Sequence, residues 1–283
     1  MKVLIVGLGK MGTLHRKYLD MLKVQWDWYD PCVKTVDKLL LNKQSHDLDT
    51  LHSYTHVIIA APTQHHADYL KLFSQKNYLG KILVEKPGVM NLHDLELLKN
   101  PSVSVGMVER FNPAFSSLQA HVEAANILSI DFVRCSARPV SRIDTNSFID
   151  VGIHDLDLFC QLFDSTQIKD INTVRKNNTF CITIQMQDGP VVRFIWSNET
   201  FHRERQIIVR QTNYNLVCDL AEQVLKKYSI SSNNKNTIES LFVEKKSPLL
   251  AELENFLYEN DSVDAIASHK LFLELLQNRL LQD

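Results

Sequence analysis

Residues 3–12 read Val-Leu-Ile-Val-Gly-Leu-Gly-Lys-Met-Gly, a β-branched apolar run that leads directly into three closely spaced glycines. The apolar run predicts a buried strand, and the following segment 11–22 has helical patterning. In a GxGxxG pattern the first glycine permits a tight turn, the second lets backbone approach a pyrophosphate, and the third lets helix and strand pack closely. The stretch therefore predicts strand, turn and helix, with a phosphate-binding turn formed by Gly7, Gly9, Lys10, Met11 and Gly12.

A carboxylate ends the second predicted strand. Residues 24–29 form an apolar run that stops at Asp30-Pro31. An acidic residue about 20 positions beyond the glycine turn is typical of a side chain that binds the ribose hydroxyls of a dinucleotide. Because Asp30 would repel a 2′-phosphate, we expect NAD as the cofactor, and the nearby Lys34 keeps NADP possible. The alternative role for Asp30 is that of a turn residue before proline.

Strands and helices alternate up to residue 112. Strands are predicted at 56–60, 81–84 and 103–108, and helices at 33–41, 66–75 and 91–98. This alternation predicts a Rossmann-type, doubly wound parallel sheet that is covered on both faces.

The pattern changes after Asn112-Pro113, where longer strands with period-two alternation begin. Apolar residues at alternate positions in 180–186, the turn Asp188-Gly189 and a second alternating run in 192–196 predict an antiparallel hairpin. Further strands are expected at 127–136, 168–175, 206–211 and 216–220, with helices at 248–258 and 262–281. We therefore predict an α/β domain over 1–112 and an α+β domain with a mostly antiparallel open sheet over 113–283.

Composition narrows the function classes. The formal charge of −2 gives no reason to expect binding to nucleic acid, and no apolar run approaches the roughly 20 residues of a membrane span. The five cysteines show no CxxC spacing, which indicates neither a disulfide framework nor a zinc site. The histidines at 52, 56, 65 and 66 lack a completing ligand set, so no metal is expected. We expect a soluble, cytoplasmic protein.

Polar side chains at helical spacing mark the candidate reacting groups. On a helix beginning near Asp150, that residue shares a face with His154 and Asp157. A histidine with an ordinary pKa near 6.5 suits proton transfer at neutral pH, and the missing side chain of Gly152 is expected to leave room for a ligand ring. The alternative is an N-cap aspartate and an interior histidine.

A lysine is expected at the edge of the parallel sheet where ligands bind. Lys86 directly follows the strand 81–84 and Glu85, and it precedes Pro87-Gly88. An ammonium group there stabilises developing alkoxide charge. A solvated surface lysine is the alternative.

With these residues in place, the chain resembles the Gfo/Idh/MocA family of NAD(P)-dependent oxidoreductases. The resemblance rests on 7–12 with His15, Asp30-Pro31, 61–66, 85–87, 109–113 and 150–157. It implies catalytic roles for Lys86, Asp150 and His154. It also implies cofactor contacts from Ala61, Pro62, Thr63, His66, Glu85 and Lys86.

The segment Arg110-Phe-Asn112-Pro is similar to the subgroup of nucleotide-sugar 3-dehydrogenases acting on UDP-N-acetylglucosamine or its uronic acid. This similarity implies substrate contacts from Arg110, Asn112 and Asp157, and further arginines at 138, 142, 203 and 205 are candidate partners of a diphosphate. The family's second domain binds substrate and often forms homodimers or homotetramers.

The expected function is hydride transfer between NAD and a ring secondary alcohol of a sugar or nucleotide-sugar. One alternative is reduction of a ketosugar or another carbonyl on the same fold, because hydride transfer runs in both directions. The other is a dinucleotide-binding sensor without turnover.

Overall fold

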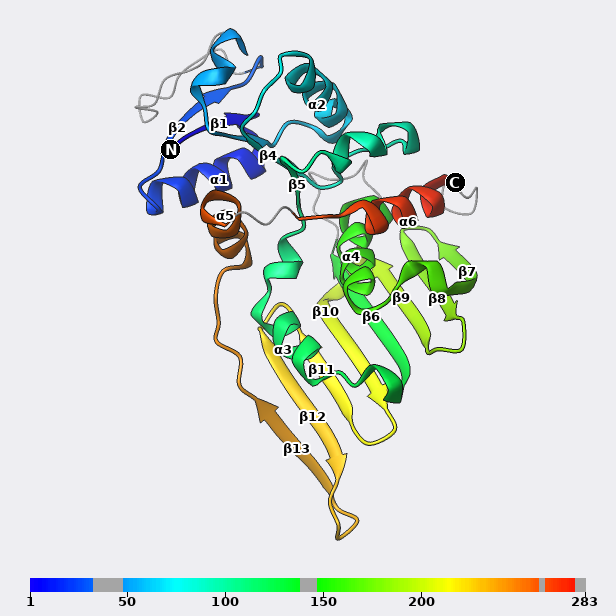
Figure 1. Ribbon diagram of the computed structural model, residues 1–283. Coiled ribbons are helices and arrows are strands. Elements are labelled where there is room, and N and C mark those ends of the chain that lie inside the picture. The colour runs from blue at the N-terminus through cyan, green and yellow to red at the C-terminus, as the bar shows by residue number, and fades with distance from the viewer. Residues whose placement is uncertain (33–47, 138–146, 260–262, 278–283) are drawn as a thin grey trace. The chain divides into compact units, whose positions relative to one another are not determined.

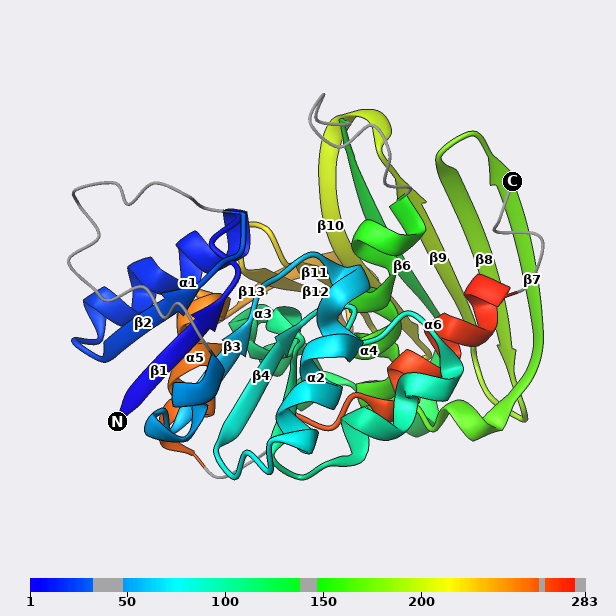
Figure 2. The same ribbon diagram turned by 90° about the horizontal axis from the view of Figure 1, so that it is seen from above.

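The computed structural model describes residues 1–32, 48–137, 147–259 and 263–277, and the chain divides into two compact units (Figures 1 and 2). Unit 1 comprises Met1–Met107 and Leu249–Leu273. Unit 2 comprises Val108–Pro248 and the described residues from Glu274 onward.

Unit 1 is built on a five-stranded parallel sheet with the strand order β2-β1-β3-β4-β5. The strands are β1 (Lys2–Val6), β2 (Gln25–Tyr29), β3 (His56–Ile59), β4 (Lys81–Glu85) and β5 (Val103–Gly106). Neighbouring side chains such as Val3 and Leu4 point to opposite faces and are both buried, so the sheet is covered on both sides. The predicted parallel α/β sheet is confirmed.

The helices of unit 1 are α1 (Lys10–Met21), α2 (His66–Gln75), α5 (Pro248–Tyr258) and the part of α6 (Ile266–Gln277) up to Leu273. The first three lie within one residue of their predicted positions, and α6 begins four residues later than predicted. Short 3-10 segments lie at Leu48–Ser53, Thr63–His65 and Leu92–Lys99, the last where an α-helix was expected. The helix predicted at 33–41 lies outside the described residues.

The chain returns to unit 1 near its C-terminus, which the expected division at 112/113 does not include. Leu253, Phe256 and Leu257 of α5 share a buried cluster with Trp26 and Trp28 of β2. Burying large apolar side chains against the sheet stabilises this arrangement by roughly 1.5–3 kcal/mol for each fully buried side chain. The second domain is therefore not the continuous segment 113–283, because α5 completes the core of the first.

Unit 2 contains an eight-stranded sheet with the order β13-β12-β11-β10-β6-β9-β8-β7. Its strands are β6 (Ile127–Ala137), β7 (Ile168–Lys176), β8 (Thr179–Met186), β9 (Val191–Ser197), β10 (Glu199–Gln211), β11 (Asn215–Asp219), β12 (Val224–Ile230) and β13 (Asn236–Leu241). Only β6 and β9 pair in parallel among these described strands. The predicted mostly antiparallel sheet and the β8–β9 hairpin are confirmed.

Two helices, α3 (Pro113–His121) and α4 (Ile153–Leu162), complete unit 2 (Figure 1). Phe159 of α4 packs edge-on against Phe194 of β9, with ring centroids 5.9 Å apart. The prediction missed α3, β12 and β13. Strand β13 is exposed along nearly its whole length, so its sequence lacks the apolar alternation by which a half-buried strand is recognised.

Candidate active site

The glycines of the turn between β1 and α1 lie in two different environments. Gly7 has φ +93°, and a Cβ on it would lie 2.7 Å from the Ala61 nitrogen. A Cβ on Gly12 would lie 1.9 Å from the Gly7 carbonyl oxygen. A Cβ on Gly9, by contrast, would have no neighbouring heavy atom within 4 Å. Protein packing therefore explains Gly7 and Gly12, whereas Gly9 borders open space that suits a ligand phosphate.

The start of α1 adds hydrogen-bond donors beside this space. Gly9 is the N-cap and provides no side-chain cap, and the exposed Lys10 and half-buried Met11 form the first turn. Unpaired amides and the positive end of the helix dipole favour an anion at such a position. These residues fit the pyrophosphate of a dinucleotide.

Asp30 joins the end of β2 to the glycine turn. Its Oδ2 accepts a hydrogen bond from the Leu8 N–H (2.8 Å), and its Oδ1 accepts one from the Cys32 N–H (2.8 Å). The side chain is half-buried. Asp30 thus has the turn-stabilising role considered above, and each carboxylate oxygen retains a lone pair for a ribose hydroxyl.

The segment after β3 places its residues in two environments. Pro62 is exposed, Ala61 is half-buried next to Gly7 of the glycine turn, and Thr63 is half-buried. His66 is buried instead: its Nδ1 lies 2.8 Å from the Pro87 carbonyl oxygen and its Nε2 lies 2.9 Å from the Ala61 carbonyl oxygen. Burial lowers the pKa of His66, and the two carbonyls oppose that shift. His66 therefore links the segment after β3 to the segment after β4, and its cofactor contact stays a prediction.

Glu85 and Lys86 lie at the carboxyl end of β4. Glu85 is buried, with its Oε1 2.6 Å from His15 Nε2. Burial raises the pKa of Glu85, but the His15 contact and the adjacent Lys86 outweigh it, so the net pKa is lowered. Glu85 is thus an internal partner of α1, whereas Lys86 is half-buried directly after the strand.

The helical segment of unit 2 begins with a π-helical turn over Phe148–Gly152 and continues as α4. Asp150 is half-buried in this turn, and His154 lies buried in the first turn of α4. A Cβ on Gly152 would lie 3.1 Å from the Trp196 ring. The prediction that Gly152 leaves room for a ligand is therefore wrong, because the indole of Trp196 fills that room.

Two expected substrate-binding residues pair with each other. Arg110 Nε and Nη2 donate to the two carboxylate oxygens of Asp157, both at 2.6 Å. Asn112 is buried, its Oδ1 accepts from the Ala114 N–H, and its Nδ2 donates to Glu109 and to the Leu220 carbonyl. Arg110, Asn112 and Asp157 thus all have partners within the protein, and their substrate contacts stay a prediction.

A buried charge network that the sequence reasoning missed supports α4 from the sheet. Arg134 of β6 donates through Nη2 to Asp155 (2.7 Å) and through Nη1 to Glu109 (2.8 Å), and all three are buried. The Trp196 Nε1–H donates to Asp155 (2.8 Å). Burial opposes ionisation of Glu109, but Arg134 holds its pKa below the usual range. The available signal was the pair of charged residues, Asp131 and Arg134, inside the otherwise apolar stretch 130–135.

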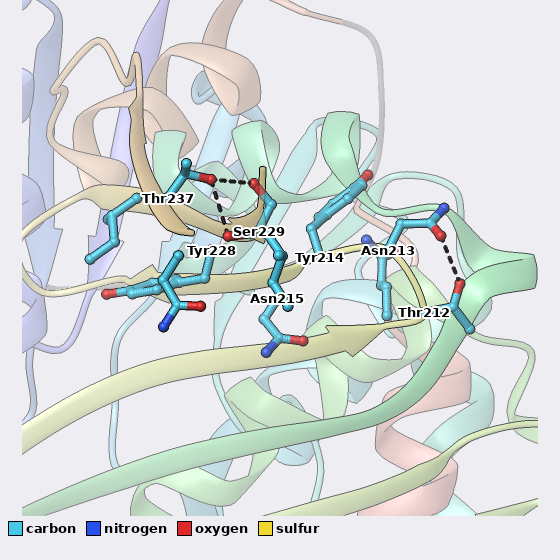
Figure 3. A pocket seen from close by; sticks show the side chains of 11 residues that line it. Thr212, Asn213, Tyr214, Asn215, Tyr228, Ser229 and Thr237 are labelled. Carbon is cyan, nitrogen blue, oxygen red and sulfur yellow. Dashed lines mark hydrogen bonds between the residues drawn. The ribbon is translucent and has the colours of Figure 1, made fainter. Parts of the chain in front are cut away.

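A cavity of about 570 Å³ lies over β10 to β13, where Tyr214, Tyr228 and Asn215 line it and the Ser229 and Thr237 hydroxyls are 2.7 Å apart (Figure 3). It contains none of the predicted site residues.

Among the described residues, no three His, Cys, Asp or Glu side chains are grouped as metal ligands, and no helix has the length and apolarity to cross a membrane. Arg138 and Arg142 lie outside the described residues.

Solved structures with this architecture include UDP-N-acetylglucosamine 3-dehydrogenase GnnA from Acidithiobacillus ferrooxidans, with a TM-score of 0.87 and 19% identity over 99% of this chain and 97% of that one. The chain shares its fold. A dehydrogenase (MviM) from Clostridium difficile aligns with a TM-score of 0.77 and 14% identity over 98% of each chain. An oxidoreductase from Bacillus cereus aligns with a TM-score of 0.76 and 16% identity over 97% and 96%. No protein-family model and no curated protein sequence matches the chain.

Proposed function

We propose that the protein is an NAD-dependent oxidoreductase of the Gfo/Idh/MocA family that oxidises a ring secondary alcohol of a sugar or nucleotide-sugar. The observation that carries this proposal is Gly9, the one glycine of the turn that packing against described residues does not require. It lies at the N-terminus of α1, where the first-turn amides suit a phosphate. The fold shared with a UDP-N-acetylglucosamine 3-dehydrogenase over 99% of this chain supports the substrate class.

In the proposed reaction, the alcohol carbon gives up a hydride and the hydroxyl gives up a proton. When bound, the nicotinamide supplies the hydride acceptor. An imidazole nitrogen of His154 takes the hydroxyl proton, and the product is a ketone. The Lys86 ammonium stabilises the alkoxide that develops on the substrate oxygen, and Asp150 orients the substrate or the imidazole. Reduction of a ketosugar uses the same groups in reverse.

Turnover and cofactor binding are measured separately to test these roles. NADH formation is followed with UDP-N-acetylglucosamine, free sugars and inositols as substrates, and NADH affinity is measured by fluorescence titration. Lys86→Met and His154→Asn are expected to lower kcat by roughly 10²–10⁴-fold while NADH affinity changes little. Lys99→Met and His202→Asn, at exposed positions, serve as controls and should keep full activity.

Each outcome assigns the protein to one class. Turnover that survives in both Lys86→Met and His154→Asn contradicts the catalytic roles. A wild-type protein that binds NADH but is inert with every substrate, in both directions, is instead a dinucleotide-binding sensor. Assembly into a homodimer or homotetramer is part of the proposal and is tested by light scattering of the wild-type protein.

A further inference from the structure

The Pro87–Gly88 peptide, which begins one residue beyond Lys86, is held on both sides by buried histidines. His66 of α2 places Nδ1 2.8 Å from the Pro87 carbonyl oxygen. The Gly88 N–H donates to Nε2 of His269, in α6, at 2.8 Å. The carbonyl of Pro87 and the N–H of Gly88 belong to one planar peptide group. Both polar atoms of this single group are therefore bonded to imidazole rings, and both rings are buried.

The hydrogen bonds fix which nitrogen of His269 carries the proton. Its Nδ1 lies 2.9 Å from the Ala265 carbonyl oxygen, which only accepts, so Nδ1 is the donor. Its Nε2 accepts from the Gly88 N–H and is therefore unprotonated. His269 is thus the neutral Nδ1–H tautomer. His66 faces a carbonyl acceptor on each side, Pro87 at Nδ1 and Ala61 at Nε2, so its bond to Pro87 forms when Nδ1 carries a proton.

The surroundings of the peptide leave few other partners. A Cβ on Gly88 would lie 3.1 Å from the Leu98 side chain and 3.3 Å from that of Val105, so the peptide lies in an apolar environment. Hydrogen bonds are stronger in such surroundings, and a polar group without a hydrogen-bond partner destabilises the protein more there than in water. The two histidines therefore restrict rotation of the Pro87–Gly88 peptide.

We infer that His66 and His269 are positioning residues for Lys86, because they fix the peptide that begins one residue beyond it. This inference rests on the proposed function, in which the Lys86 ammonium stabilises the developing alkoxide. The sequence offers no local sign of the contact, since residue 269 is 181 positions from Gly88. In this role both histidines act on Lys86 through the Pro87–Gly88 peptide.

The test replaces His269 in two ways. Glutamine offers a side-chain oxygen near the position of Nε2 and can accept from the Gly88 N–H, whereas leucine removes the acceptor. His56→Leu is the control for loss of a buried histidine in the same unit, because His56 packs against Phe256 in α5 and does not contact the Pro87–Gly88 peptide. The melting temperature of each variant reports any general loss of stability.

Two readouts do not depend on turnover. In His269→Leu, hydrogen exchange of the Gly88 amide is expected to be about 10-fold faster, as the loss of one buried hydrogen bond predicts. The rate at which an amine-reactive acetylating reagent modifies Lys86, measured by peptide mass spectrometry, is expected to change. Both values should return toward wild type in His269→Gln and stay unchanged in His56→Leu. Nitrogen NMR of the imidazole should show Nδ1 of His269 protonated and Nε2 unprotonated.

Steady-state kinetics then test whether the Pro87–Gly88 peptide affects the proposed reaction. In His269→Leu, kcat should fall roughly 10- to 100-fold, since small misplacement of a catalytic group has effects of this size, while KM for NAD stays nearly constant. Equal results for leucine and glutamine, or equal losses in His56→Leu, would overturn the inference, as would a protonated Nε2. If the wild-type protein turns over no substrate, the proposed function fails, and exchange and labelling still decide whether the histidines hold the peptide.

Discussion

The two units hold their candidate site residues by different means. In unit 1, the glycine turn, Asp30 and the Pro87–Gly88 peptide are held by contacts that involve the main chain. In unit 2, the helix that carries His154 rests on a buried cluster of ionised side chains centred on Arg134. Main-chain geometry depends on a few glycines and capping residues in a short stretch, whereas the charge cluster depends on partners far apart in the chain.

This difference predicts different responses to substitution. A tight backbone turn is destabilised when a side chain is added at one of its glycines, because there is no space for the added atoms. A charge cluster fails when a side chain is removed, because the remaining charges lose their partner inside a low-dielectric interior.

The largest effect is expected for Arg134→Met. The change leaves the Glu109 and Asp155 carboxylates buried without their common partner, so the free energy of unfolding should fall by about 3–5 kcal/mol. The control is Arg193→Met, which removes a half-exposed arginine from its pair with Asp131 and should cost about 1 kcal/mol or less. Urea unfolding measures both. Similar losses in the two variants would show that unit 2 does not depend on the buried cluster.

A pair of glycine substitutions tests the backbone in unit 1. Gly12→Ala places a methyl group on the Gly7 carbonyl oxygen and should destabilise the protein by about 1–3 kcal/mol. Gly9→Ala meets no protein atom, so stability should change by less than about 0.5 kcal/mol. NADH affinity should nevertheless fall about 10-fold in Gly9→Ala, because the methyl group occupies the space assigned to the pyrophosphate. Unchanged NADH affinity in Gly9→Ala would remove the main support for the proposed cofactor site.

Acid should affect the two units in different pH ranges. Burial, together with Lys81, lowers the pKa of His56 in unit 1 to about 4. As the pH falls below about 6.5, the unfolded chain binds a proton that native His56 excludes, so stability declines down to about pH 4. In unit 2, the pKa of Glu109 is lowered in the native state. The stability that Glu109 contributes is therefore fully present above the pKa of the unfolded chain, near 4.3, and it is lost as the pH falls through the native pKa.

The smallest predicted effect follows from this difference. His56→Gln should reduce the loss of stability between pH 7.5 and 5 by about 1 kcal/mol, a value that allows for solvent screening. Hydrogen exchange of the amides in β3, compared with those in β6, measures the change. The expected response is confined to β3, and an equal response in both strands would mean that the units unfold together.

The sequence predicted the places in the fold of those candidate residues that short-range patterns mark. The glycine turn, Asp30 at the end of β2, and Lys86 after β4 each follow an apolar strand, and strand ends are visible in hydrophobic patterning. The surroundings of Asn112 and Gly152 could not be predicted in this way, because each residue packs or bonds against a distant partner. For Asn112 that partner is the Leu220 carbonyl, and for Gly152 it is the Trp196 ring.

By itself, the sequence determined that a parallel α/β sheet with a glycine turn is followed by a mostly antiparallel sheet, because side-chain periodicity along one strand or helix is a local property. The tertiary structure decided that α5 completes the core of unit 1, that Arg134 joins Glu109 to Asp155, and that His269 bonds the Gly88 amide. These contacts join residues far apart in the chain. Burial makes them energetically important, and only the folded arrangement specifies which groups are buried together.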